Sequence, residues 1–147
     1  MTRFCILAAL LLAASPVFAI SPKDLVGDWS GRHEETVKGK SETISVRLEG
    51  SKTTGGGFQL VEYASSLSIT ATYVFKKDGK FSCKTVQYGM YVLSSYSGRW
   101  QTSSGKLVIS ADGRDGRLLG SVVETEKGFK FTGNASKSKI VITAKRG

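Results

Sequence analysis

The sequence has few of the residues from which metal centres and nucleophilic active sites are usually built. It contains one histidine, His33, and two cysteines, Cys5 and Cys83. A zinc site needs several His or Cys ligands at close spacing, and Ser-His-Asp or Cys-His catalysis needs a histidine beside its nucleophile. No such spacing surrounds His33. We therefore expect no catalytic residues, no metal site and no cofactor, and we predict that the protein is not an enzyme.

The carboxylates offer little more for acid–base chemistry. Glu124 and Glu126 lie beside turn residues, where alternation places them in water, and the adjacent pair Glu34 and Glu35 is the other candidate. We expect His33 to lie exposed at the end of a strand. The alternative is that it hydrogen-bonds a ligand at the mouth of a barrel.

The sequence also lacks an apolar run long enough to span a membrane. Residues 4–14 are apolar, which is about half of the roughly 20 residues that a spanning helix needs. Arg3 precedes this run, and Val17-Phe18-Ala19 supplies small residues after it, in the order typical of a signal peptide. We predict a signal peptide at 1–19 and one domain at 20–147, secreted or periplasmic, with no membrane span after cleavage. An uncleaved anchor is the alternative.

Removal of 1–19 leaves Cys83 as the only cysteine, so the domain has no intramolecular disulfide. Phe81, Cys83 and Thr85 alternate with polar residues and share one face of a strand. We expect Cys83 to point inward as a small apolar side chain. The fold must then be stabilised by its core and its hydrogen-bonded strands.

Positive charge exceeds negative charge, with a formal net charge of +9. Such an excess favours contact with anionic polymers or lipid head groups. The lysines are scattered through turns, however, which is typical of a solvated surface. Anionic polymers of the cell envelope are possible partners, whereas nucleic acid is not expected, because the aromatic residues alternate inward and away from the lysines.

What the sequence does have is a series of short segments in which apolar and polar residues alternate, each ended by a glycine-containing turn. In one of them Ile44, Val46 and Leu48 share a face that alternates with polar residues. This period of two predicts strands with one buried face. Before them, Ser21-Pro22 and Gly27 bracket a predicted helical turn. No helical period follows Gly27.

Two turns can be assigned from the register that they impose. A three-residue loop at 77–79, with Gly79 left-handed, pairs Phe75 with Phe81 and Tyr73 with Cys83, which keeps apolar residues together. A loop at 102–105 would pair Trp100 with Leu107. The strand before that loop is expected to place Met90, Val92, Tyr96 and Trp100 on one face.

Nine or ten such strands follow one another without long connections. This order predicts an all-β fold, an antiparallel up-and-down β-barrel of about 8–10 strands with a short N-terminal helical turn, because closure removes the exposed sheet edges. An immunoglobulin-like sandwich is the competing architecture. The short connections favour the barrel.

Three motifs resemble those of the small bacterial lipocalin-like domains of the calycin group: Leu25-Val-Gly-Asp-Trp29 with its Gly-x-Trp signature, Phe75-Lys-Lys-Asp-Gly-Lys-Phe81, and Gly98-Arg-Trp100 with Leu107-Val-Ile109. The resemblance implies that Trp29 closes one end of the barrel beneath a basic side chain, Lys145 or Arg146. The residues expected to form this base are Gly27, Trp29, Trp100 and Arg146. The Thr-Asp-Tyr turn motif and the cysteine pair of lipocalins are absent.

The same resemblance implies a small hydrophobic or lipid-like ligand inside the barrel. The predicted lumen residues are Leu67, Ile69, Tyr73, Met90, Val92, Tyr96 and Phe131. The tyrosine hydroxyls are available to orient a polar end of the ligand. The alternative is a solid barrel that serves as an interaction protein of the cell envelope, either as a hydrolase inhibitor or through contact with anionic glycans or lipids.

Overall fold

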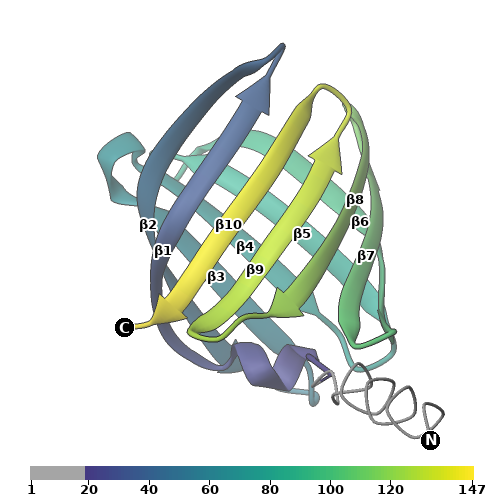
Figure 1. Cartoon of the computed structure of the whole chain (residues 1–147). Coiled ribbons are helices and arrows are strands. Elements are labelled where there is room, and N and C mark those ends of the chain that lie inside the picture. Colours follow the sequence, from purple (N-terminus) through teal and green to yellow (C-terminus); the bar gives the residue numbers. More distant parts are fainter. Residues whose placement is uncertain (1–18) are drawn as a thin grey trace, which may run out of the picture.

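The computed structural model describes residues 19–147, so the predicted signal peptide lies outside the described residues apart from Ala19. Ten antiparallel strands form one continuous sheet that closes on itself (Figure 1). The elements in chain order are η1 (Pro22–Leu25), β1 (Gly27–Val37), β2 (Lys40–Lys52), β3 (Phe58–Ala64), η2 (Ser65–Leu67), β4 (Ile69–Phe75), β5 (Lys80–Gln87), β6 (Tyr91–Ser103), β7 (Lys106–Gly113), β8 (Gly116–Glu124), β9 (Gly128–Ala135) and β10 (Ser138–Arg146).

Closure comes from the pairing of β1 with both β2 and β10. Every other strand pairs with its neighbours in sequence, so the topology is up-and-down, as predicted, and the sandwich alternative is wrong. A closed sheet leaves no strand edge unpaired. Among residues 19–147, no helix has the length and apolar character needed to cross a lipid bilayer.

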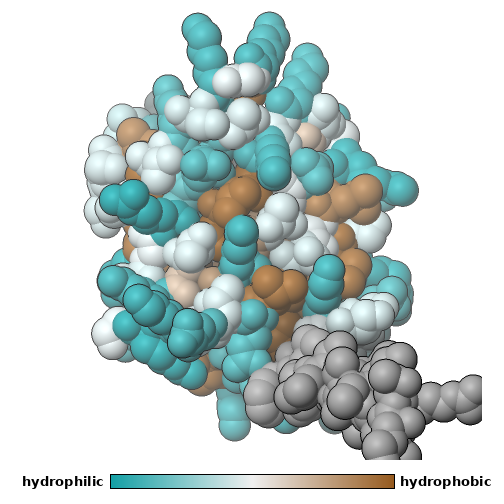
Figure 2. Space-filling model, viewed as in Figure 1, coloured by the Kyte–Doolittle hydropathy of each residue, from teal (hydrophilic) through white to brown (hydrophobic). Residues whose placement is uncertain are grey.

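The alternation read from the sequence places the core inside the barrel. Leu48 and Leu107 are fully buried, and Phe129 and Ile109 are 2% exposed. Cys83 is also buried, as predicted. Residues of hydrophilic and intermediate hydropathy cover most of the outer face that Figure 2 presents, with hydrophobic areas between them. Burial of these inward side chains is the main source of stability, since the hydrophobic effect scales with the apolar area removed from water.

The lower end of the barrel in Figure 1 is closed by η1, which lies across it. The backbone N–H of Ser21 donates to Asp24 Oδ2 at 2.8 Å, which caps this predicted helical turn. Ile20 and Leu25 are buried, and the Ile20 N–H donates to the carbonyl of Gly105 in the β6–β7 turn. The segment 20–25 therefore spans the base from β7 to β1, and we call this end the base.

Trp29 packs directly above η1. Its ring is 4% exposed and meets Phe129 edge to face, with 4.9 Å between the ring centroids. Its indole N–H donates to the Leu25 carbonyl at 2.9 Å. The Arg146 guanidinium lies over the ring at 4.1 Å from the centroid, a cation–π contact. The basic side chain above Trp29 is thus Arg146 rather than Lys145, and a Cβ on Gly27 would overlap it.

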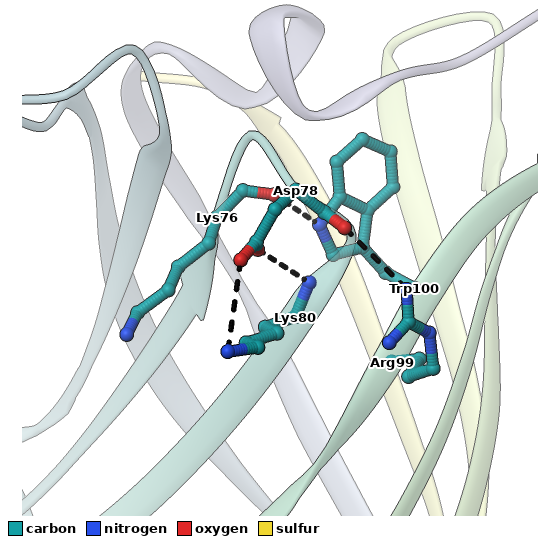
Figure 3. Close-up of polar contacts among 5 residues, drawn as sticks. All are labelled: Lys76, Asp78, Lys80, Arg99 and Trp100. Carbon is teal, nitrogen blue, oxygen red and sulfur yellow. Dashed lines mark hydrogen bonds and ion pairs between the residues drawn. The ribbon is translucent and has the colours of Figure 1, made fainter.

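Trp100 also lies near the base, on β6 (Figure 3). Its indole N–H donates to the Lys76 carbonyl at 2.8 Å, and its ring packs against Phe75 at 6.3 Å. Arg99 Nη2 donates to the Asp78 carbonyl, and the Lys80 N–H donates to Asp78 Oδ1. The bonds from Trp100 and Arg99 hold the β4–β5 turn against β6, and the bond from Lys80 lies within the turn.

The β4–β5 turn has the register predicted from the sequence. Phe75 pairs with Phe81, and Tyr73 pairs with Cys83. Gly79 has φ +90°, a conformation that costs glycine little and other residues more. The predicted three-residue loop is confirmed.

Two expectations for β6 are wrong. The β6–β7 turn is the two-residue loop Ser104-Gly105, so Trp100 pairs with Ile109 rather than with Leu107. In addition, the β5–β6 register shifts between Thr85 and Val86, where β6 carries an extra residue. Such a bulge reverses which face the following side chains occupy. Val92 is consequently 54% exposed and does not share a face with Tyr96, and Met90, which lies in the turn before β6, is 70% exposed.

Candidate functional site

A cavity of about 370 Å³ occupies the barrel at the end opposite the base. Its walls come from nearly every strand and from η2. The apolar lining residues are Ile44, Ala64, Leu67, Ile69, Ala71, Leu93, Leu118, Phe131, Ala135 and Ile140; the polar ones are His33, Glu35, Glu42, Glu62, Tyr73, Cys83, Thr85, Ser94, Tyr96 and Ser138. Leu67 and Leu93, at the rim, are 44% and 46% exposed. The cavity therefore opens at this end, which we call the mouth.

A buried carboxylate lies in the wall of the cavity. Glu62 is on β3, between the inward residues Leu60 and Ala64, and it is 3% exposed. Its Oε2 bonds His33 Nδ1 from β1 at 2.7 Å, and its Oε1 accepts a bond from the Tyr73 hydroxyl of β4 at 2.9 Å. Partners of this kind compensate for the removal of a charge from water.

The charge of Glu62 acts on His33. Burial lowers the pKa of His33, but the hydrogen bond and the negative charge of Glu62, together with the charge of Glu35, outweigh burial and raise it above 6.5. The raised pKa favours an imidazolium paired with a carboxylate. Because Nδ1 bonds Glu62, Nε2 is the ring nitrogen that remains for a ligand.

Two other groups in the cavity respond to the same carboxylate. Burial, and then the charge of Glu62, raises the pKa of Tyr73 well above 10. Burial and the charge of Glu62 raise the pKa of Cys83 to about 12. Both groups are therefore neutral at physiological pH. Cys83 is not a thiolate nucleophile, since reactivity requires the deprotonated form.

The ion pair between His33 and Glu62 can be tested directly, because the untagged chain has a single histidine. We expect the imidazole signals of His33 to titrate above pH 6.5 in a proton NMR pH series. In Glu62→Gln the pKa should fall, because burial remains while the main raising charge is removed. An unchanged His33 pKa in that variant would contradict the ion pair.

The raised pKa of His33 also makes the stability of the fold depend on pH. A histidine pKa that is higher in the folded than in the unfolded state stabilises the fold below about pH 6.5. That contribution should be lost as the pH rises through the folded pKa of His33. His33→Gln should abolish this part of the pH dependence in chemical denaturation.

The structure brings five of the seven predicted lumen residues to the cavity: Leu67, Ile69, Tyr73, Tyr96 and Phe131. Leu67 does so from η2, which precedes β4. Met90 and Val92 are wrong as lumen residues. Met90 lies in the β5–β6 turn, and the bulge turns Val92 outward.

His33 is the main correction at the site. It was expected to be exposed at a strand end, but its side chain is only 19% exposed and points into the barrel. The structure thus favours the alternative location, facing the lumen. The alternation of the sequence is consistent with this inward position. Trp29, Gly31 and His33 share one face of β1, and Trp29 on that face is buried.

Glu62 was not predicted as a site residue. The sequence feature that indicates it is an acidic residue at an inward position of an alternating strand, between Leu60 and Ala64. A carboxylate at such a position is rarely buried without a partner. The partners, His33 and Tyr73, come from other strands, 29 and 11 residues away in sequence.

Within residues 19–147, no group of three or more His, Cys, Asp or Glu side chains is arranged to hold a metal ion. No protein-family model matches the chain, and the comparison with curated proteins finds no relative. A closed ten-stranded antiparallel barrel is compatible with a calycin-like fold.

Proposed function

We propose that the protein is an exported, lipocalin-like binding protein that holds a small hydrophobic or lipid-like molecule in its barrel. The observation that carries this proposal is the cavity of about 370 Å³, whose lining combines apolar side chains with polar ones and includes the buried Glu62. Ligand sites of proteins have this composition and span about 300–1,000 Å³. The volume is at the lower limit of that range and favours a small ligand.

The two ends of the barrel differ in a way that suits binding. The base is filled by Trp29, Phe129 and η1, whereas the other end is hollow and open at the rim. This difference favours binding over the alternative of a solid barrel acting only through its surface. Export rests on the predicted signal peptide at 1–19, and it places the protein in the periplasm or outside the cell.

A cavity-filling variant tests the proposal. Ala71 is 5% exposed and lines the cavity from β4, while Thr72 points to the outside of the same strand. We expect the uncharged dye Nile red to bind with a blue-shifted emission, at one dye per barrel. Ala71→Phe should weaken this binding at least about tenfold, because the ring fills the space that the dye needs.

Thr72→Phe is the matched control, since it adds the same side chain outside the lumen. It should bind the dye as the unmodified protein does, and thermal unfolding of both variants checks that they are folded. No dye uptake by the unmodified protein would refute a binding function. Equal dye binding by Ala71→Phe would place the bound dye outside the cavity.

A further inference from the structure

We propose that the ligand held in the barrel carries a protonated amine that binds Glu62, with its apolar part against the cavity walls. This inference rests on the binding function proposed above and names the class of ligand. It follows from the charges that line the cavity, from the acceptor positions left on Glu62, and from the burial of that carboxylate.

The cavity of this basic protein is acidic. Its lining includes three carboxylates, Glu35, Glu42 and Glu62, and one group that becomes cationic, His33. None of the lysines or arginines of the described chain belongs to the lining. The lysines on the outer surface act weakly inside, because exposed charges are screened over about 8 Å at physiological ionic strength. When His33 is protonated, the three carboxylates still outnumber this one cation; Glu35 and Glu42 are exposed at the mouth, and Glu62 is buried.

This negative charge includes a buried group and is not only a feature of the rim. Glu62 is 3% exposed, and its two oxygens each make one hydrogen bond, to His33 and to Tyr73. A carboxylate offers about four acceptor positions, so two remain. An ammonium group has three donors and no acceptor, which suits the free positions of Glu62.

The rest of the cavity suits the remainder of such a ligand. Ile44, Ile69 and Phe131 are among its apolar lining residues. An aliphatic or aromatic part of the ligand that packs against them is removed from water, which favours binding. A ligand with a carboxylate would bring a further negative charge close to Glu62 in a poorly solvated space. Like charges in such an environment repel strongly, so a fatty acid fits this cavity less well than an amine.

Three compounds of equal chain length separate the possibilities: octylamine, octanol and octanoate. Each is titrated at pH 7 into the Nile red complex of the protein, and displacement of the dye gives its affinity. We expect octylamine to bind at least about tenfold more tightly than octanol, since charge-assisted hydrogen bonds are about twice as strong as neutral ones. Octanoate should bind most weakly.

Glu62→Gln keeps the size of the side chain and removes its charge. In this variant octylamine should bind about as weakly as octanol, while the affinity for octanol changes little. Glu34→Gln is the control for net charge, because Glu34 is exposed on the outer face of β1. It should leave the affinities for all three compounds unchanged.

The ranking of the three compounds on the unmodified protein needs no variant, so it decides the matter even if Glu62→Gln fails to fold. If octanoate or octanol binds as tightly as octylamine, the proposed amine ligand is wrong, while the proposed binding function is unaffected. Undiminished octylamine binding by folded Glu62→Gln would also overturn the amine ligand. Failure of Nile red to bind the unmodified protein would overturn both proposals.

Discussion

Trp29→Ala is expected to lower the free energy of unfolding by about 3–5 kcal/mol, the usual range for removing a large aromatic side chain from a core. Trp29 is 4% exposed, meets Phe129 edge to face and donates its indole N–H to the Leu25 carbonyl. Its loss opens a cavity between the core and η1, and it leaves Arg146 without its cation–π contact. Urea denaturation followed by circular dichroism measures the change.

Trp100→Ala is the matched control. Trp100 also donates its indole N–H to a backbone carbonyl and also packs against a phenylalanine, but its side chain is partly exposed. Its removal should therefore destabilise the protein less than Trp29→Ala does. A loss below about 1 kcal/mol for Trp29→Ala, or a larger loss for Trp100→Ala, would show that the base is not closed by Trp29.

Gly50→Val is the second change with a large expected effect. A Cβ at Gly50 would overlap the backbone carbonyl of Leu25, so a side chain there has to push η1 away from the base. Overpacking of this kind usually destabilises by about 1–3 kcal/mol, and more where backbone has to move. Near-ultraviolet circular dichroism should also change, because Trp29 packs against the displaced segment.

Ser51→Val controls for the effect of a β-branched residue in the same strand. Ser51 follows Gly50 in β2 and is exposed on the outer face. The control should leave the unfolding free energy within about 0.5 kcal/mol of the unmodified protein. Equal stability of Gly50→Val and the unmodified protein would mean that η1 does not pack tightly on β2.

The architecture was predictable because alternation and turn chemistry act locally. In β2 the apolar residues Ile44, Val46 and Leu48 define the inward face without reference to any other strand. At the β4–β5 turn, Gly79 and the match of Phe75 with Phe81 define the register. Closure followed from the number of such strands and the shortness of their connections.

The errors arose where a strand departs from simple alternation. Continuing the period of two through β6 predicts Met90 and Val92 in the lumen, but Met90 lies in the turn before β6, and an extra residue of β6 opposite Thr85 and Val86 reverses the face of Val92. Nothing in the local sequence marks a bulge that has no glycine. The β6–β7 turn is shorter than predicted for a related reason. Ser104 adopts a positive φ, which is not expected of a serine, and this allows a two-residue loop.

The central pair of the candidate site was missed because it is formed only in three dimensions. His33 and Glu62 look like ordinary surface residues when each is considered alone. Alternation places both on inward faces, but their contact depends on the pairing of β1 with β2 and of β2 with β3. Buried polar residues are understood only together with their partners, which sequence spacing does not reveal.

The claim on which the function depends most is that the lumen is hollow and holds a molecule. Native mass spectrometry of the protein purified from cells that export it tests this most directly. We predict a second mass, larger than the polypeptide by one small organic molecule, which is absent from Ala71→Phe and present in Thr72→Phe. A single mass equal to the polypeptide, together with no uptake of Nile red or octylamine, would contradict the claim.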